Sequence, residues 1–274
     1  MDLETLLAGV VIPIDKPRQW TSFQAVNKIK AAIRNHYGIK KFKIGHAGTL
    51  DPLATGLLLV CVGKATKRIP ELQDGEKVYS GTMVLGATTP CYDLERPIDA
   101  RYPYSHITPE RLEEARRQFL GDIQQVPPIF SAVKIGGQRA YKIAREAISG
   151  DNAPTPKTVH IAEFDITGFR RAPAHSFPTA PANSQFSIDS TRSSTSVLNS
   201  HLYKSPLGTV PPELPQVDFR IRCGKGTYIR SLARDFGLAL DSGAFLSALR
   251  REQVGDYTLA DAIPLDAIET LFAQ

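Results

Sequence analysis

Cysteine is scarce in this sequence of 274 residues, which has three, and none belongs to a C-x-x-C pair. That scarcity argues against a disulfide framework and against a zinc site built from cysteines. Long apolar runs are also missing: the longest, Leu57–Val62, falls far short of the roughly 20 residues that a membrane helix needs. The N-terminus begins acidic and lacks the basic region of a signal peptide. We therefore expect a cytoplasmic protein that contacts no membrane.

Several cofactor and catalytic motifs are absent as well. The Gly-Lys pairs at 63–64 and 224–225 resemble the end of a phosphate-binding loop, but the earlier glycine and the following Ser or Thr are missing. The sequence has neither H-E-x-x-H nor G-x-S-x-G, and its six histidines are scattered. These absences argue against a nucleotide-dependent enzyme, a metalloenzyme and a serine hydrolase, and we expect no metal and no cofactor.

Acidic residues are missing from three stretches, 16–43, 133–145 and 220–234, which together hold more than half of the 33 lysines and arginines. If these stretches fold onto one face, they form a positive surface that attracts a polyanion. Aromatic side chains among them, such as Trp20 and Tyr141, could stack on bases. The alternative is three separate solvated faces that point in different directions.

The order of elements predicts one α+β domain over residues 1–274. Helices are expected from the capping box of Thr21 and Gln24 to Gly38, from Thr108 to Gly121, over 140–148, and from Ile229 to near Gly243. Strands are expected at Val11–Ile14, Leu57–Val62, Lys77–Leu85, Val159–Phe169, Val217–Cys223 and Gln253–Tyr257. This irregular alternation predicts a mixed, mostly antiparallel sheet flanked by helices. Arg170–Gln216 is rich in Ser, Thr and Pro and is expected to be a surface insertion in that domain.

Three segments could carry chemistry. The glycine-rich segment GHAGTLDPLATG, at 45–56, is expected to form a loop that presents His46 and Asp51, although Asp before Pro is also ordinary turn chemistry. A strand, a Gly-Lys-Gly turn and a helix start with Arg230 form an anion site for a phosphate or for a carboxylate of another loop, unless the helix is merely basic and solvated. Tyr79 opens a strand after a predicted loop at 63–75, where a lone tyrosine more often packs than reacts.

Together these segments resemble the TruB family of tRNA pseudouridine synthases. The matching motifs are GHAGTLDPLATGLLLVCVGKATK (45–67), KVY (77–79) and GKGTYIRSLARDFG (224–237), with IDKPRQWTSF (14–23), PPIFSAVKIGGQRAYKIAR (127–145) and Leu249-Arg250-Arg251. They occur in the family's order from about Val11 to Thr258, apart from the insertion. Several ordered motifs of this length are a far more specific signal than any single one.

The resemblance implies an RNA isomerase that converts the uridine at position 55 of tRNA, in the T-loop, to pseudouridine without a cofactor. The base would be everted, detached from C1′ at N1, turned and rejoined through C5. Asp51 would be the essential carboxylate, Arg230 its cationic partner and Tyr79 the aromatic that stacks on uracil. The cation matters because burial alone raises the pKa of a carboxyl group. Whether the carboxylate attacks C1′, attacks the ring or assists by deprotonation stays open.

The resemblance and the basic stretches also assign the RNA contacts. His46 would hold the everted nucleotide, and Leu249 would pack near its base. Further contacts to the T-arm are expected from Lys16, Lys134, Tyr141, Arg145 and Lys225. The stretch from 130 to 145 matches a mobile lobe of the family that closes on RNA.

The sequence departs from the family in three places. Thr88–Asp93 replaces a Thr-Asp-Thr run, the insertion has no counterpart, and the chain ends soon after Tyr257, which leaves no room for a C-terminal PUA domain that binds RNA. We expect a monomer that binds tRNA with no obligate protein partner. Two alternatives remain: a non-catalytic RNA-binding or tRNA-folding module on the same fold, and a synthase that acts on another RNA, such as messenger RNA.

Overall fold

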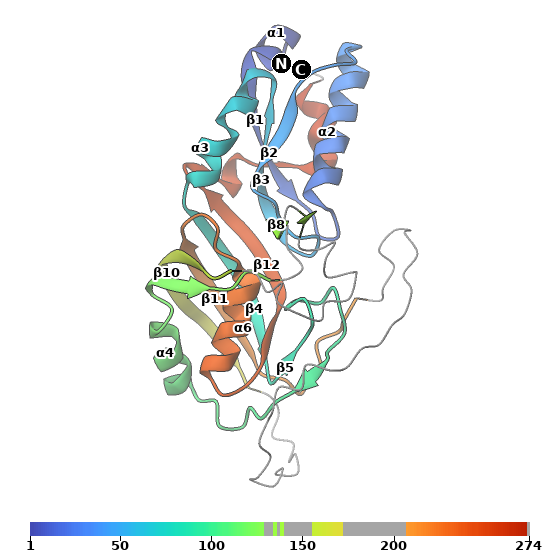
Figure 1. Cartoon of the computed structure of the whole chain (residues 1–274). Helices are drawn as coiled ribbons and strands as arrows, with labels where there is room; N and C mark the ends of the chain where they lie inside the picture. Colours follow the sequence, from blue (N-terminus) through green and yellow to red (C-terminus); the bar gives the residue numbers. More distant parts are fainter. Residues whose placement is uncertain (129–133, 136–137, 140–154, 172–206, 273–274) are drawn as a thin grey trace.

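The computed structural model describes residues 1–128, 134–135, 138–139, 155–171 and 207–272 (Figure 1). The predicted helix over 140–148, most of the predicted lobe and most of the predicted insertion lie outside these residues. So do Tyr141 and Arg145, and the structure describes Lys134 only as part of a short strand.

One large sheet dominates the described part of the chain. It contains ten strands, and its main path runs β14-β1-β3-β12-β4-β11-β10-β7, with β13 on β12 and β2 on β3. Its strands are β1 (Val10–Lys16), β2 (Ile44–Ala47), β3 (Thr55–Val62), β4 (Lys77–Leu85), β7 (Gly121–Gln125), β10 (Lys157–Arg170), β11 (Gln216–Cys223), β12 (Ala244–Val254), β13 (Tyr257–Thr258) and β14 (Ile263–Pro264). Only β1 with β14 and β12 with β3 pair in parallel among these strands. The predicted mixed, mostly antiparallel sheet is therefore confirmed.

Two small hairpins and several helices complete the described elements. The hairpins pair β5 (Ala87–Thr88) with β6 (Ala100–Arg101), and β8 (Lys134–Ile135) with β9 (Gln138–Arg139). The helices are α1 (Leu3–Gly9), α2 (Ser22–Tyr37), α3 (Ile69–Asp74), α4 (Pro109–Arg117) and α6 (Ile229–Ala239), with 3₁₀ turns η1 (Gly63–Arg68), η2 (Leu259–Asp261) and η3 (Leu265–Leu271). The interval 63–75, predicted to be a loop, thus holds η1 and α3. No described helix is long and apolar enough to cross a membrane.

The helix boundaries follow the signals in the sequence. Thr21 and Gln24 form the predicted capping box of α2, and the helix ends at Gly38, whose φ of 67° lies in the left-handed region. α4 begins with Thr108 as its cap and a proline in its first turn. α6 ends at Ala239, a few residues before the predicted stop. The predicted single strand 253–257 is wrong, because it spans the end of β12, a turn at 255–256 and the start of β13. β12 begins nine residues earlier, at Ala244, and its start is buried on both faces and so shows no alternation.

The core joins the two ends of the sheet. Figure 1 shows α2 beside β1 and β3 at one end, and α6 against β12 at the other. Ile29 and Ile33 of α2 belong to the same buried cluster as Leu232 and Phe236 of α6. All three cysteines are buried with free thiols. The loop between β2 and β3 lies between the first turn of α2 and the first turn of α6. The candidate site forms at this loop.

Candidate active site

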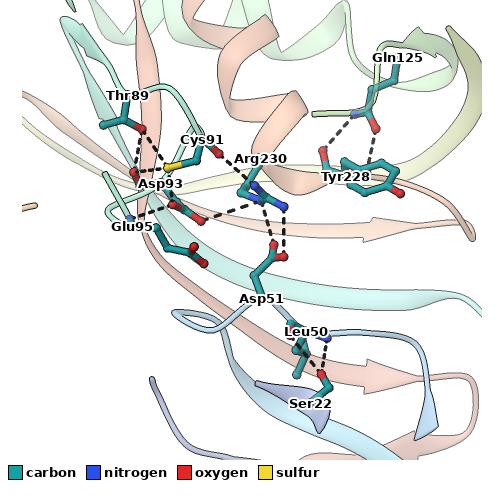
Figure 2. A network of polar contacts seen from close by, with 10 residues as sticks. All are labelled: Ser22, Leu50, Asp51, Thr89, Cys91, Asp93, Glu95, Gln125, Tyr228 and Arg230. Carbon is teal, nitrogen blue, oxygen red and sulfur yellow. Dashed lines mark hydrogen bonds and ion pairs between the residues drawn. The ribbon is translucent and has the colours of Figure 1, made fainter. Parts of the chain in front are cut away.

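Asp51 and Arg230 form a bidentate ion pair, although 179 residues separate them in the chain (Figure 2). Arg230 Nε donates to Asp51 Oδ2 at 2.8 Å, and Arg230 Nη2 donates to Oδ1 at 3.1 Å. The Arg230 side chain is 7% exposed, whereas the Asp51 side chain is 35% exposed. The sequence allows either a phosphate or a carboxylate of another loop as the partner of Arg230. In the structure the partner is the carboxylate of the Asp51 loop.

The Asp51 loop is fixed by hydrogen bonds on both sides of the carboxylate. The Ser22 hydroxyl, at the start of α2, accepts from Leu50 N at 2.9 Å and donates to Leu50 O at 3.1 Å. Pro52 O accepts from Gln19 N at 2.8 Å. Ala54 N donates to the carbonyl of Asp51 at 3.2 Å, so the expected turn is present. The turn uses the backbone of Asp51 and leaves its side chain to the ion pair.

The start of α6 is anchored to β7. The Gln125 side chain, which is 1% exposed, donates to Tyr228 O at 3.1 Å and accepts from Tyr228 N at 2.8 Å (Figure 2). These two bonds join the N-cap residue of α6 to β7, and Tyr228 O also accepts from Leu232 N at 3.0 Å within the helix. Arg230 lies in the first turn of this anchored helix, so its guanidinium points to a defined place.

Asp93 lies on another side of the same guanidinium. Arg230 Nη1 donates to Cys91 O at 3.1 Å, and Asp93 Oδ2 lies 3.9 Å from Arg230 Nε. Asp93 is 5% exposed, and its Oδ1 accepts from the Cys91 thiol at 3.0 Å and from Glu95 N at 2.9 Å. The segment that departs from the family run thus still provides a carboxylate beside Arg230.

One cation faces three carboxyl groups at this site. Burial acts to lower the pKa of Arg230, but the charges of Asp51, Asp93 and Glu95 outweigh it and raise that pKa. Burial also raises the pKa of Asp93, against the effect of Arg230. The pKa of Glu95 rises to about 7, first through burial and then through its two acidic neighbours. Arg230 therefore stays charged, while the carboxyl groups around it compete for its charge.

An open pocket begins at the exposed side of Asp51. Its empty volume is about 260 Å³, including space that opens to solvent, and it is lined by Asp51, Leu53, Ala54, Asp93, Arg230, Leu246, Ser247, Ala248 and Leu249. The lining combines the charged side chains of Asp51, Asp93 and Arg230 with apolar side chains from the Asp51 loop and β12. Leu249, predicted to pack near the base, is one of these apolar lining residues.

Tyr79 and His46 lie next to this site but do not line the pocket. Tyr79 is 9% exposed on β4, directly opposite Arg251 of β12. Burial raises the pKa of Tyr79, and Arg251 opposes that rise through its charge and a side-chain hydrogen bond. His46 is partly buried on β2. Burial and, next, the charge of Arg251 lower the pKa of His46, which favours the neutral imidazole.

Lys16 and Lys225, two predicted RNA contacts, have different surroundings. Lys16 is fully buried, and its ammonium donates to the carbonyls of Pro17, Trp20 and Pro52 at 3.0, 2.6 and 3.4 Å. In this structure Lys16 therefore holds the Asp51 loop and does not face solvent. Lys225 is exposed and pairs with exposed Asp74 at 2.9 Å.

The basic stretch 220–234 contains no acidic residue, but in the folded chain its cations form ion pairs with acidic residues from outside the stretch. Its ion pairs join Arg220 to Glu163 and Glu252, Arg222 to Glu163, Lys225 to Asp74, Arg230 to Asp51 and Asp93, and Arg234 to Asp235. In the stretch 16–43, by contrast, the exposed Arg18, Arg34, Lys40, Lys41 and Lys43 form no ion pair with any described residue. Among the described residues of the predicted positive surface, the unpaired cations therefore lie in the segment around α2.

Sequence reasoning missed two residues of this neighbourhood. Asp93 belonged to a segment noted only for its departure from the family, and its position beside Arg230 depends on tertiary contacts. Arg251 was noted only as part of the Leu249–Arg251 triplet, although its burial at 2% exposure sets it apart from exposed arginines. Within the part of the chain that the structure describes, no group of His, Cys, Asp and Glu gathers as metal ligands would.

The chain is similar to several known proteins. The family model for the N-terminal domain of TruB family pseudouridylate synthases matches residues 34–180. The chain belongs to the TruB family. Among relatives of this TruB-family chain, tRNA pseudouridine synthase B of Flavobacterium johnsoniae is 46% identical, covering 98% of both chains. The enzyme of the same name from Phocaeicola vulgatus is 44% identical, covering 94% of this chain and 91% of its own. The TruB-family chain is thus a pseudouridine synthase, an isomerase.

Solved structures show the same fold. A chain of a Cbf5-Nop10-Gar1 complex superposes with a TM-score of 0.59 at 24% identity, covering 98% of this chain and 56% of that chain. A chain of the archaeal box H/ACA sRNP Nop10-Cbf5 complex gives 0.56 at 22% identity, covering 99% and 56%. This TruB-family chain therefore spans just over half the length of those solved chains, and the likeness concerns the fold. The expected pseudouridine-synthase-like α+β fold is confirmed.

Proposed function

We propose that this TruB-family enzyme converts the uridine at position 55 of tRNA, in the T-loop, to pseudouridine, with Asp51 as the essential carboxylate. The names of its relatives support tRNA as the substrate. The observation that carries the assignment of Asp51 is its bidentate pair with Arg230 at the edge of an open pocket. The T-loop uridine is the target that the family resemblance implies.

The reaction needs an ionised carboxylate in a fixed orientation. It breaks the bond between uracil N1 and ribose C1′, forms one between C5 and C1′, releases the C5 proton and returns a proton to N1. Whether Asp51 attacks the ribose, attacks the ring or removes a proton, the route starts from the anion. Arg230 favours that anion with two charge-assisted hydrogen bonds, and Cys91 O and Asp93 hold the guanidinium from other sides. The atoms balance without a cofactor or water.

We propose that the pocket receives the everted nucleotide. Inside a stacked T-loop the glycosidic bond is inaccessible, and eversion costs a few kcal/mol that binding must offset. Leu246, Ala248 and Leu249 of β12 line the pocket together with the charged groups and offer apolar surface to a base. We assign Leu249 to packing against the base and His46 to holding the nucleotide from β2. Tyr79 is assigned to stack on uracil, which requires a rearrangement that brings its buried ring to the pocket.

The remaining RNA contacts are proposed to come mainly from the positive segment around α2. Its exposed and unpaired cations are free to displace counterions from phosphates. Lys134, Tyr141, Arg145 and Lys225 stay proposed contacts. For Lys16 we propose an indirect contribution, because its ammonium is occupied by three carbonyls that include Pro52 of the Asp51 loop. We also propose that the protein acts as a monomer in the cytoplasm.

The experiment that tests the function is turnover of an unmodified tRNA transcript. Tritium release from 5-tritiated uridine measures the reaction, and chemical mapping locates the pseudouridine. We expect Asp51→Asn to reduce the rate by at least about 1,000-fold while T-arm affinity stays within a factor of about three. Measurable turnover by that variant would refute the role of Asp51. Tight T-arm binding by the unaltered protein without tritium release would favour the non-catalytic module. Pseudouridine found in another RNA, and not in tRNA, would favour a synthase with a different substrate.

Asp15 provides a matched control. It also forms a bidentate pair, with Arg250 at 3.1 and 2.7 Å, and its side chain is 34% exposed, nearly the same as Asp51. Because this pair does not line the pocket, we expect Asp15→Asn to retain turnover within about twofold. A loss in both variants would indicate that removing any such ion pair disturbs the fold.

A further inference from the structure

Arg251 is a buried cation without a carboxylate partner among the described residues. It is 2% exposed on β12, and its Nε donates to Leu57 O at 2.8 Å while its Nη2 donates to Gly48 O at 3.1 Å. Burying a charge is costly unless it is paired or fully hydrogen-bonded, and carbonyl dipoles compensate only in part. A shorter apolar side chain would fill a sheet interior at lower cost. The position therefore calls for a reason beyond packing.

The contacts of Arg251 connect the catalytic loop to Tyr79. Gly48 lies three positions before Asp51, so the bond to Gly48 O restrains the entry to the Asp51 loop. Arg251 and Tyr79 are direct cross-strand partners between β12 and β4, which places their side chains on one face of the sheet. Arg251 is also the partner of Gly56 on β3. One residue thus contacts both strands that flank it and the loop between β2 and β3.

The glycines of the Asp51 loop fit around this arginine. At Gly56, with φ of +100°, an added Cβ would lie 2.3 Å from Arg251 O. At Gly48, with φ of +91°, it would lie 3.5 Å from Arg251 Nη1. Both backbone conformations are ones that side chains rarely adopt. The close approach of the β12 backbone therefore explains Gly56, whereas Gly48 is explained by its positive φ. Through these contacts the motif and the Leu249–Arg251 triplet form one structural unit.

The charge of Arg251 reaches the same group of residues. It lowers the pKa of His46 after burial, and it opposes the effect of burial on Tyr79. It also helps to lower the pKa of Lys16 to about 8, where burial is the main cause and Asp51 acts in the opposite direction. The guanidinium thus acts electrostatically on three groups near Asp51, although burial is the larger cause of each pKa shift.

We propose that Arg251 is a positioning residue of the isomerisation, which holds the Gly48–Asp51 segment and Tyr79 in one fixed relation. The proposal rests on the proposed function, in which Asp51 and Tyr79 meet the target nucleotide. Arg251 itself does not line the pocket, so it acts through these two residues. A purely structural role would lower stability alone. A positioning role lowers turnover in the folded protein and changes the titration of Tyr79.

The test compares Arg251→Gln and Arg251→Lys with Arg250→Gln. Arg250 is the adjacent arginine, and its side chain is 40% exposed. For folded Arg251→Gln we expect kcat to fall on the order of 100-fold, as after loss of one preorganised donor, with KM for tRNA within about threefold. Arg251→Lys should regain part of that loss, because it keeps the charge but cannot bridge both carbonyls. Arg250→Gln should keep kcat within about twofold.

A readout without RNA separates this proposal from the function on which it rests. Alkaline absorbance titration of each protein minus its Tyr79→Phe counterpart isolates the Tyr79 phenol among nine tyrosines. We expect its midpoint to rise in Arg251→Gln and to stay nearer the original in Arg251→Lys. An unmoved midpoint, or unchanged kcat in folded Arg251→Gln, would overturn the proposal. If that variant does not fold, Arg251→Lys decides: kcat about 10-fold lower supports positioning, and unchanged kcat refutes it. A wild-type protein that modifies no T-loop uridine would refute the proposed function and leave the titration result valid.

Discussion

Asp93 Oδ2 lies 3.9 Å from Arg230 Nε, the same nitrogen that donates to Asp51. The two carboxylates therefore share one guanidinium, which Cys91 O holds at a third point. Because a guanidinium is planar with donors in fixed directions, its orientation is set by all of its acceptors together. The orientation of the Asp51 carboxylate then depends on a residue from a different segment of the chain.

This arrangement predicts the effect of Asp93→Asn. The amide keeps the shape but removes the charge, so Arg230 loses part of its restraint while Asp51 keeps its own partner. We expect kcat to fall on the order of 10-fold, with T-arm affinity unchanged, in single-turnover tritium-release assays. Asp99→Asn is the control, since Asp99 is an exposed carboxylate close by in the chain. Equal rates for Asp93→Asn and the unaltered protein would contradict a role for Asp93 in holding Arg230.

Glu95 predicts a dependence of stability on pH. Its pKa rises from 4.5 to about 7 in the folded protein, chiefly through burial. The folded state thus binds the Glu95 proton more tightly than the unfolded state does, and this contribution to stability is lost as pH rises from 4.5 through 7. We expect Glu95→Gln to raise the free energy of unfolding by about 3 kcal/mol at pH 8, and by about 1 kcal/mol at pH 5. Urea unfolding of both proteins measures this, and an equal difference at both pH values would contradict it.

Parts of the fold could be predicted from local sequence, because local physics determines them. The capping box and Gly38 set both ends of α2, and the alternating residues of Val217–Cys223 predict the central antiparallel strand that forms β11. The apolar start of β12 could not be recognised, because a strand between two neighbours and under a helix shows no alternation.

The prediction of the site depended on the family resemblance. No local rule pairs Asp51 with Arg230, which lie far apart in the chain. From the chemistry of the residues alone, Asp51 could have belonged to an ordinary turn and Arg230 to a basic, solvated helix. The charge pattern also gave a misleading prediction for the stretch 220–234, because most of its ion-pair partners come from distant segments of the chain. Glu163 of β10 pairs with Arg222 of β11 across the sheet, so a stretch without acids in sequence is neutralised in space. Pairing between strands decides which charges remain free.

The buried ammonium of Lys16 predicts a loss of turnover without a loss of phosphate contacts. Lys16→Met removes the three carbonyl contacts that tie Trp20 and Pro52 together, so the Asp51 loop should loosen. We expect kcat to fall at least about 10-fold. The slope of log Kd against log salt for T-arm binding should stay the same, whereas removing one phosphate contact lowers it by about 0.7 to 0.9. A reduced slope would show that Lys16 reaches RNA after all.

The exposed cations after α2 predict where RNA binding depends on salt. Lys40, Lys41 and Lys43 are exposed and form no ion pair with described residues, so each can displace a counterion from a phosphate. The triple change of these lysines to Gln should weaken T-arm binding at least about 10-fold at ~50 mM salt and lower the salt slope by about 2. Arg117→Gln is the control, because Arg117 on α4 is equally a surface cation but pairs with Glu113 at 3.2 Å. Filter binding across a salt series measures both quantities. If the control variant loses as much affinity and slope as the lysine variant, net charge and not this segment governs binding.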